Sequence, residues 1–170
     1  MARPPTDDEF TEFVRTAWPA LYRTAYLLVG DRGLAEDLVQ TTLTKTYASW
    51  GRIRDLGAAG VYARTILVNT ATSWFRRRSW GSEISTSTVP DAALPAVDSD
   101  RPLVLAALRA LPPRQRAVVV LRFYEDLSVE QTAAALGINP GTVKSQTSHA
   151  MSRLRSLLGD AVIPEGAHHG

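Results

Sequence analysis

The chain has 170 residues, of which 45% are hydrophobic and 21% charged, and this balance excludes a wholly disordered polypeptide. It contains no cysteine, which excludes a disulfide framework, a thiolate zinc site and a cysteine nucleophile. The net charge is only +2, and the N-terminus lacks an apolar signal core. Apolar runs such as Ala117 to Leu121 are far shorter than the ~20 residues of a membrane helix, so we expect a cytoplasmic protein without membrane insertion.

Residues 7–29 carry apolar side chains every three or four positions, which predicts an amphipathic helix. Gly30 is expected to end it, and Asp31 to cap a second helix that runs towards Trp50. Three glycines between residues 51 and 60 predict a loop, and a third long helix is expected over residues 60–79. Trp50 is expected in the core. The apolar positions that recur along the two helices are Phe10, Phe13, Val14, Ala17, Leu21, Tyr22, Ala25 and Leu28, then Leu34, Leu38, Leu43 and Tyr47.

The second predicted helix carries acidic and polar residues on its outer side, namely Glu36, Asp37, Gln40 and Thr44. Such a face is suited to docking a protein partner. A solvated helix face, however, is the commoner interpretation of such a composition.

The third predicted helix has two distinct faces at 100° per residue. Amide, hydroxyl and guanidinium groups share one side, and these groups suit phosphates and base edges. Tryptophans around the same helix could stack on unpaired bases. The structural alternative is that the arginines favour a helix C-terminus and the tryptophans fill a core. The predicted inner face is Val61, Val68, Ala71, Thr72 and Phe75, and the outer face is Tyr62, Asn69, Ser73, Arg76 and Arg77.

Small, polar and proline residues dominate positions 81–101, and such a composition predicts a flexible linker. The net charge also changes along the chain near this segment. Residues 1–75 have no net charge, and Arg76 to Arg78 add three positive charges. Residues 79–100 hold four acidic groups and no basic one, and residues 101–170 are net positive. This distribution suggests two anion-binding modules on a tether, although arginine enrichment in a GC-rich genome would also produce it. We predict domains at 1–80 and 102–160, with a disordered tail at 161–170.

The second domain is predicted to be a helix-turn-helix. Helices are expected from Leu103 to Leu111 and, after Pro112-Pro113, from Arg114 to Tyr124. Ser128 and Gln131 match a capping box for a short helix, and Gly137 supplies a sharp turn. Asn139 is then expected to cap a final helix with Pro140 at its first position. The fold class is therefore all-α, with two small helical domains.

The last predicted helix has an apolar face and an outward face that lacks acidic residues. Donors of modest length near a helix N-terminus are how a recognition helix meets the major groove. A solvated face in a helical bundle is the alternative, and no ligand set supports His149 as a metal ligand. The apolar face is Val143, Thr147, Ala150, Met151, Leu154, Leu157 and Leu158. The candidate DNA contacts are Thr142, Lys144, Ser145, Gln146, Ser148 and His149, with Arg153 and Arg155 for the backbone.

Four sequence blocks together resemble a known family. Asp31 to Gln40 is similar to the helix by which sigma factors bind the RNA polymerase clamp. Asn69 with Ser73 to Arg77 is similar to their promoter −10 reading helix. The order of the blocks and the linker between them also fit, over residues 8–158. The blocks at 111–118 and 121–128 look like the opening of the −35 reading domain, and the block at 141–145 looks like the start of its recognition helix.

The whole resembles an extracytoplasmic-function sigma factor of an actinobacterial type. This resemblance implies a non-enzymatic protein without a cofactor that docks on core RNA polymerase through Glu36, Asp37 and Gln40. It also implies binding to duplex promoter DNA and to the melted non-template strand, with the loop at 51–60 holding an unpaired base, and it raises an anti-sigma factor as a further partner. Ser73 and Gln146 depart from the acidic residue and the arginine that relatives often carry, so the promoter sequence stays open.

Three other functions are weighed against this one. A stand-alone helix-turn-helix regulator would bind an operator without polymerase, usually as a dimer, and no sustained heptad seam is present. A small nuclease would need converging carboxylates or a histidine base, whereas the acidic residues lie on separate predicted helices. A regulator that binds sigma factors is disfavoured by the two basic faces.

Overall fold

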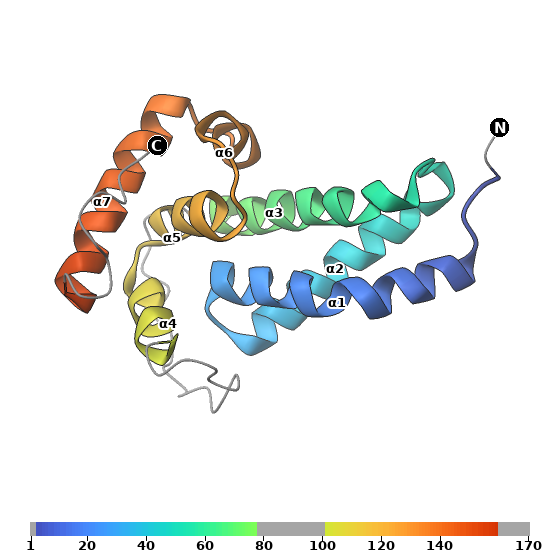
Figure 1. Cartoon of the computed structure of the whole chain (residues 1–170), viewed down its shortest axis with the longest axis horizontal. Coiled ribbons are helices and arrows are strands. Elements are labelled where there is room, and N and C mark those ends of the chain that lie inside the picture. The colour runs from blue at the N-terminus through green and yellow to red at the C-terminus, as the bar shows by residue number, and fades with distance from the viewer. Residues whose placement is uncertain (1–2, 78–100, 160–170) are drawn as a thin grey trace. The chain divides into compact units, whose positions relative to one another are not determined.

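A computed structural model describes residues 3–77 and 101–159, and every regular element in these two ranges is a helix (Figure 1). The predicted all-α class is thereby confirmed. The chain divides into two compact units, Met1–Trp74 and Phe75–Gly170. The predicted tail and nearly all of the predicted linker lie outside the described residues. Within the described ranges, no helix has both the length and the apolar character that crossing a membrane requires.

The first two helices begin and end at their predicted signals. Helix α1 (Asp7–Val29) starts with a capping box, in which the Thr6 hydroxyl accepts from the Glu9 N–H at 3.2 Å and the Glu9 carboxylate accepts from the Thr6 N–H at 2.7 Å. Gly30 ends it in the left-handed conformation, at φ 71°, which a glycine adopts without a steric penalty. Asp31 caps α2 (Arg32–Ala48) by accepting from the Leu34 N–H at 2.9 Å.

The core of the first unit lies where α1 and α2 pack against each other and where α3 (Ala59–Arg77) contributes its apolar side. Leu28, Leu38 and Leu67 from these three helices are fully buried. Two threonines of α2 are also fully buried, and their hydroxyls donate to carbonyls one turn earlier in the same helix, at 2.7 and 2.8 Å. Because these hydroxyls are satisfied locally, Thr42 and Thr46 enter the core without an unpaired polar group.

The capping box of α1 leads us to expect that the stability of the chain depends on pH. The hydrogen bond from Arg3 is the largest cause that lowers the pKa of Glu9 from 4.5 to about 2. A carboxyl with a lowered pKa in the folded state stabilises the fold above its ordinary pKa, and this contribution is lost as the pH falls through the folded value. We expect the melting temperature of the chain to exceed that of a Glu9→Gln variant above pH 5 and the difference to shrink towards pH 2. A circular dichroism melting series checks this, and a constant difference over that range would contradict it.

The second unit contains α4 (Arg101–Ala110), α5 (Pro113–Val119), η3 (Val120–Tyr124), α6 (Val129–Leu136) and α7 (Pro140–Leu158), with α7 packed on α4, α5 and α6. Its core is aliphatic, with Val118, Leu121 and Val143 fully buried. The predicted break at the double proline is present, and Pro113 occupies the first turn of α5. The predicted helix from 114 to 124 ends in the π-helical segment η3, in which the Glu125 N–H donates to the Val120 carbonyl at 3.0 Å.

The predicted helix-turn-helix is formed by α6 and α7. Ser128 and Gln131 make both bonds of a capping box, at 2.8 and 3.0 Å. Gly137 ends α6 at φ 66°, and the Asn139 side chain then accepts from the Thr142 N–H at 2.8 Å to cap α7. These local signals fix where the second helix begins and therefore which side chains it presents outward.

Three residues that helical periodicity places on an apolar stripe or an inner face are exposed. Val61 is 57% exposed because the buried stripe of α3 runs through Ala59 and Ala63, from which Val61 points away. Leu157 is 49% exposed in the last turn of α7, beyond its last buried residue, Leu154. Tyr47 is 48% exposed in the last turn of α2, where its hydroxyl donates to Asp7 at 3.0 Å.

Candidate functional site

The acidic side of α2 is directed to solvent. Glu36, Asp37, Gln40 and Thr44 are all exposed, whereas the neighbouring Leu38 is fully buried. The structure therefore brings all four predicted residues to one surface. Two adjacent carboxylates on an exposed helix side suit a partner surface that carries basic groups.

The polar side of α3 is also exposed as expected. Buried Ala63, Leu67 and Ala71 form the opposite side of the helix, and Arg76 and Arg77 fall in the last turn, where cations are favoured by the helix dipole. This places an amide, a hydroxyl and two guanidinium groups on a surface that could meet a nucleic-acid backbone. The exposed residues are Tyr62, Asn69, Ser73, Arg76 and Arg77.

Lys45, beside this surface, was not among the candidate residues predicted from the sequence. The Lys45 ammonium of α2 donates to the hydroxyl of Thr70 on α3 at 3.0 Å, and Thr70 is adjacent in sequence to Asn69. The bond holds a positive charge at the margin of the polar side of α3. Local sequence carries no signal for it, because the two residues are 25 positions apart on different helices.

The loop predicted at 51–60 ends at 58 in the structure, because α3 begins at Ala59, and it contains two short 3-10 turns, η1 (Trp50–Arg52) and η2 (Leu56–Ala58). Arg52, Arg54 and Leu56 are exposed along it, and the Asp55 side chain accepts from the Gly57 N–H at 2.9 Å. Trp50 is only 3% exposed, so the prediction that it lies in the core is confirmed. The loop thus exposes two guanidinium groups and one apolar side chain, and it begins at the buried Trp50.

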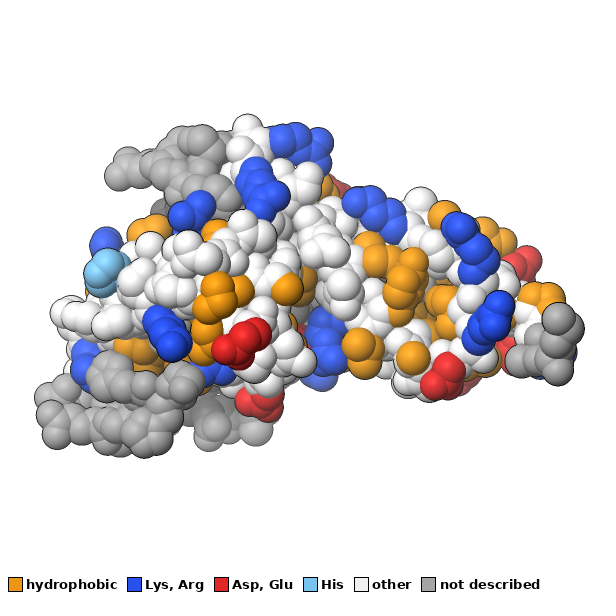
Figure 2. All heavy atoms as spheres, turned by 90° about the horizontal axis from the view of Figure 1, so that it is seen from above, with side chains coloured by type: hydrophobic (Ala, Val, Ile, Leu, Met, Phe, Trp, Pro, Cys, Tyr) orange, Lys and Arg blue, Asp and Glu red, His pale blue; other side chains and the backbone are white. Residues whose placement is uncertain are grey.

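The exposed side of α7 carries donors and no carboxylate. Val143, Ala150 and Leu154 are buried on its other side. Figure 2 shows Lys and Arg side chains exposed on the visible face of each unit. Of the predicted contact residues on α7, Lys144, Ser145, Ser148, His149 and Arg153 are exposed, while Thr142 and Gln146 are half-buried.

Arg116 differs from these surface cations because it is buried. Its guanidinium donates to the Leu111 carbonyl at 3.2 Å, and burial, followed by the nearby Arg109, lowers its pKa to about 10. It therefore remains charged at neutral pH and tethers Leu111, the residue that follows α4, to α5. Its role is structural.

The described residues contain no group of three or more His, Asp or Glu side chains placed to hold a metal ion. The chemistry of the exposed faces is that of binding: a carboxylate surface on α2, donor surfaces on α3 and α7, and a loop with basic and apolar side chains.

Two family profiles match the chain. Residues 101–154 match the profile described as sigma-70, region 4, and residues 13–81 match sigma-70 region 2. The first of these ranges contains the helix-turn-helix, and the second contains the acidic side of α2, the loop and the polar side of α3.

Individual relatives agree with the profiles. The chain is 46% identical over 153 residues to an RNA polymerase sigma-E factor of Streptomyces avermitilis, covering 88% of this chain and 85% of the relative. It is 34% identical over 146 residues to the ECF RNA polymerase sigma factor SigL of Mycobacterium tuberculosis, covering 81% and 82%. Among solved structures, the sigma factor RpoE of Bartonella quintana, crystallised with the anti-sigma factor NepR, aligns with a TM-score of 0.64 at 32% identity, covering 88% of this chain and 96% of that one.

Proposed function

Because the chain belongs to the extracytoplasmic-function sigma factors of the sigma-70 family, which bind core RNA polymerase and direct transcription initiation, we propose how its exposed faces divide that work. Residues 1–80 form the domain that binds polymerase and the −10 element. Residues 102–160 form the domain that reads the −35 element, and residues 81–101 link the two. The protein acts in the cytoplasm, where polymerase and promoter DNA are found.

The acidic side of α2 is the polymerase-binding surface. Its four predicted residues, Glu36, Asp37, Gln40 and Thr44, are exposed on one side of a helix whose other side is buried, so a partner can reach them without disturbing the core. Paired carboxylates give such a contact both orientation and a fast association rate with a basic partner.

The polar side of α3 and the preceding loop bind the −10 element. Tyr62, Asn69 and Ser73 offer groups for base edges, and Arg76 and Arg77 contact phosphates. The loop at 51–58, with Arg52, Arg54 and Leu56 exposed, holds a base of the melted non-template strand, because an apolar contact combined with guanidinium groups suits an unpaired nucleotide.

The observation that carries the −35 assignment is the exposed side of α7, where a well-capped second helix of a helix-turn-helix presents donors and no acid. Residues near its start reach base edges, and Arg153 contacts the backbone. Each domain alone binds its promoter element weakly. The linker raises the effective concentration of the second domain once the first is bound, so the two domains together bind the promoter tightly. The proposed contacts are Thr142, Lys144, Ser145, Gln146, Ser148, His149 and Arg153.

The same exposed faces suggest control by an anti-sigma factor. The relative RpoE is known in complex with one, and the two chains align over most of their lengths. A protein that covered the α2 surface would block polymerase binding by direct competition. Capture of such a partner from the native host, followed by its displacement with core polymerase, would test this regulation.

The primary test is binding to core RNA polymerase, because it needs no known promoter. We expect a one-to-one complex of nanomolar affinity when the purified chain is mixed with core enzyme and analysed by size exclusion and titration. A well-folded chain that binds promoter DNA but not the polymerase would instead support a stand-alone helix-turn-helix regulator.

Lys144 provides a test of the −35 surface. Each phosphate contact contributes about 0.9 to the slope of log affinity against log salt on duplex DNA. We expect Lys144→Ala to weaken holoenzyme binding to a promoter duplex and to lower the magnitude of that slope by roughly one, whereas Lys144→Arg keeps it. A salt titration of all three proteins checks this, and an unchanged slope in the alanine variant would remove Lys144 from the interface.

A further inference from the structure

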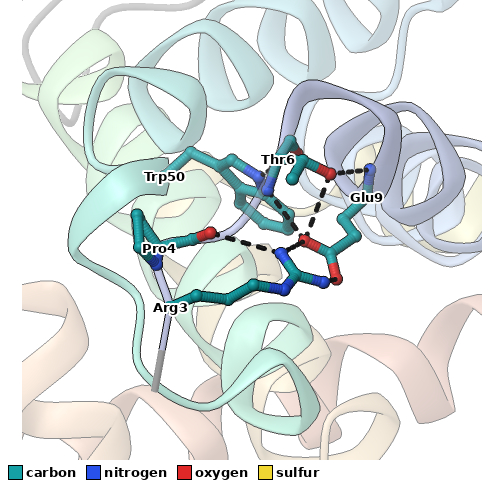
Figure 3. Close-up of polar contacts among 5 residues, drawn as sticks. All are labelled: Arg3, Pro4, Thr6, Glu9 and Trp50. Carbon is teal, nitrogen blue, oxygen red and sulfur yellow. Dashed lines mark hydrogen bonds and ion pairs between the residues drawn. The ribbon is translucent and has the colours of Figure 1, made fainter. Parts of the chain in front are cut away.

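The N-terminal segment, residues 3–9, reaches across to the start of the loop before α3. The indole N–H of Trp50 donates to the main-chain carbonyl of Thr6 at 2.8 Å, so the bond joins residues 44 positions apart (Figure 3). The ring of Trp50 also lies 5.1 Å from that of Phe10, edge-on, and 5.4 Å from that of Phe13. Trp50 is therefore fixed by one polar contact and two aromatic ones.

The carbonyl that receives this bond is itself held in place. Arg3 donates to both carboxylate oxygens of Glu9, at 2.8 and 3.0 Å, while Glu9 also accepts from the Thr6 N–H (Figure 3). The segment is thus closed into a ring from Arg3 to Glu9, with Thr6 at its centre. An exposed ion pair adds little stability by itself, so its consequence here is geometric.

Trp50 is the last buried residue before the loop. The next buried residue is Ala59, fully enclosed at the start of α3, and Ile53 is the only half-buried residue among positions 51–58, which are otherwise exposed. The path of the loop is set by these two buried ends together with the 3-10 turns η1 and η2 and the Asp55 side chain, which accepts from the Gly57 N–H. Gly51 and Gly57 leave its backbone permissive, so the anchor at Trp50 has a large influence on where Arg52 and Arg54 point.

We propose that residues 3–9 form a strap that positions the loop at 51–58 for capture of the unpaired −10 base, with Trp50 and Glu9 as positioning residues. This rests on the proposed role of the loop. A binding loop held in its bound shape before the ligand arrives avoids the cost of ordering, so loosening the contact between Thr6 of the strap and Trp50 weakens capture without changing the DNA contacts themselves.

Two matched variants separate positioning from folding. Trp50→Phe keeps an aromatic ring against Phe10 and removes the donor to Thr6. The matched control is Tyr47→Phe, which also removes one polar contact between α2 and the N-terminal segment, the 3.0 Å bond to Asp7. Like Trp50, Tyr47 contacts Phe10, with 4.9 Å between the ring centroids. Tyr47 lies within α2 and does not anchor the loop, so only the Trp50 variant is expected to affect base capture.

The measurement uses holoenzyme assembled from the full chain and Streptomyces core RNA polymerase. The probe is a single-stranded non-template oligonucleotide carrying the −10 element of a promoter that the wild-type holoenzyme selects from random DNA. We expect Trp50→Phe to weaken binding of this oligonucleotide about fivefold, which corresponds to one net hydrogen bond, and Tyr47→Phe to leave it unchanged. Affinity for core polymerase is expected to be the same for all three proteins.

A second pair of variants avoids the core altogether. Glu9→Ala removes both the Arg3 pair and the capping box, whereas Glu9→Gln keeps the capping box because an amide oxygen can still accept from Thr6. We expect a loss of about threefold in oligonucleotide affinity for the alanine variant, smaller than that of Trp50→Phe because Glu9 acts on the Thr6 carbonyl only indirectly, and recovery of most of it in the glutamine variant.

Each outcome has a distinct meaning. Failure of the wild-type holoenzyme to bind the oligonucleotide would refute the proposed role of the loop. Wild-type binding with no loss in either Trp50→Phe or Glu9→Ala would overturn the strap alone. If the variants lost affinity for core RNA polymerase as well as for the oligonucleotide, Trp50 and Glu9 would support folding of the domain, and the strap would also be overturned.

Discussion

Replacing Asp37 with arginine is expected to abolish holoenzyme formation while leaving the chain folded. Asp37 is exposed on α2, and the adjacent Leu38 makes the core contacts of that turn, so the substitution changes surface charge by two without altering packing. If the partner surface is basic, an attraction becomes a repulsion, and like charges placed together at an interface cost several kcal/mol. A loss of affinity on the order of a hundredfold or more follows, since each ~1.4 kcal/mol is tenfold.

The matched control is Glu12→Arg. Glu12 lies on the exposed side of α1, where it pairs with Arg15 at 3.1 Å, and its reversal changes the net charge by the same amount. That exposed pair contributes little to stability. We expect the control to bind core polymerase as the wild type does in a fluorescence titration, with circular dichroism unchanged for both variants. Equal affinities for Asp37→Arg and wild type would show that polymerase binds elsewhere.

The elements that sequence reasoning predicted well are those whose signals are local. Thr6 was not singled out, but Gly30, Asp31, Ser128 and Asn139 end or cap helices where expected, because each bond joins residues three or four positions apart. The all-helical class follows from the same short-range periodicity. The outward faces of α2 and α3 follow as well, since a helix with one buried stripe presents its other side to solvent.

What sequence reasoning missed depends on contacts between distant residues. The bond from Trp50 to Thr6 has a main-chain carbonyl as its acceptor, so the identity of the side chain at position 6 does not predict it. Lys45 meets Thr70 only because α2 and α3 pack in a particular register. The exposure of Val61 has the same origin: periodicity places it near an apolar stripe, but the neighbouring helices decide where that stripe is covered.

The double substitution Arg76→Glu and Arg77→Glu is expected to prevent stable promoter binding while leaving polymerase binding intact. Both side chains are exposed in the last turn of α3, on the surface proposed for the −10 element. The change removes two cations and adds two anions where DNA phosphates would lie. We expect holoenzyme affinity for the promoter to fall by more than a hundredfold and the salt slope to decrease in magnitude by roughly two.

A double reversal on α1, Arg15→Glu and Arg23→Glu, alters the net charge equally and provides the control. Both of these arginines are exposed and lie on a helix that carries none of the proposed DNA contacts. If long-range charge alone governed promoter affinity, the two double variants would behave alike at low salt and converge with the wild type as screening increases. A loss confined to the α3 variant and still present at 0.15 M ionic strength, about the physiological level, would instead identify a direct contact. Retention of promoter affinity by that variant would place the −10 interface on another surface.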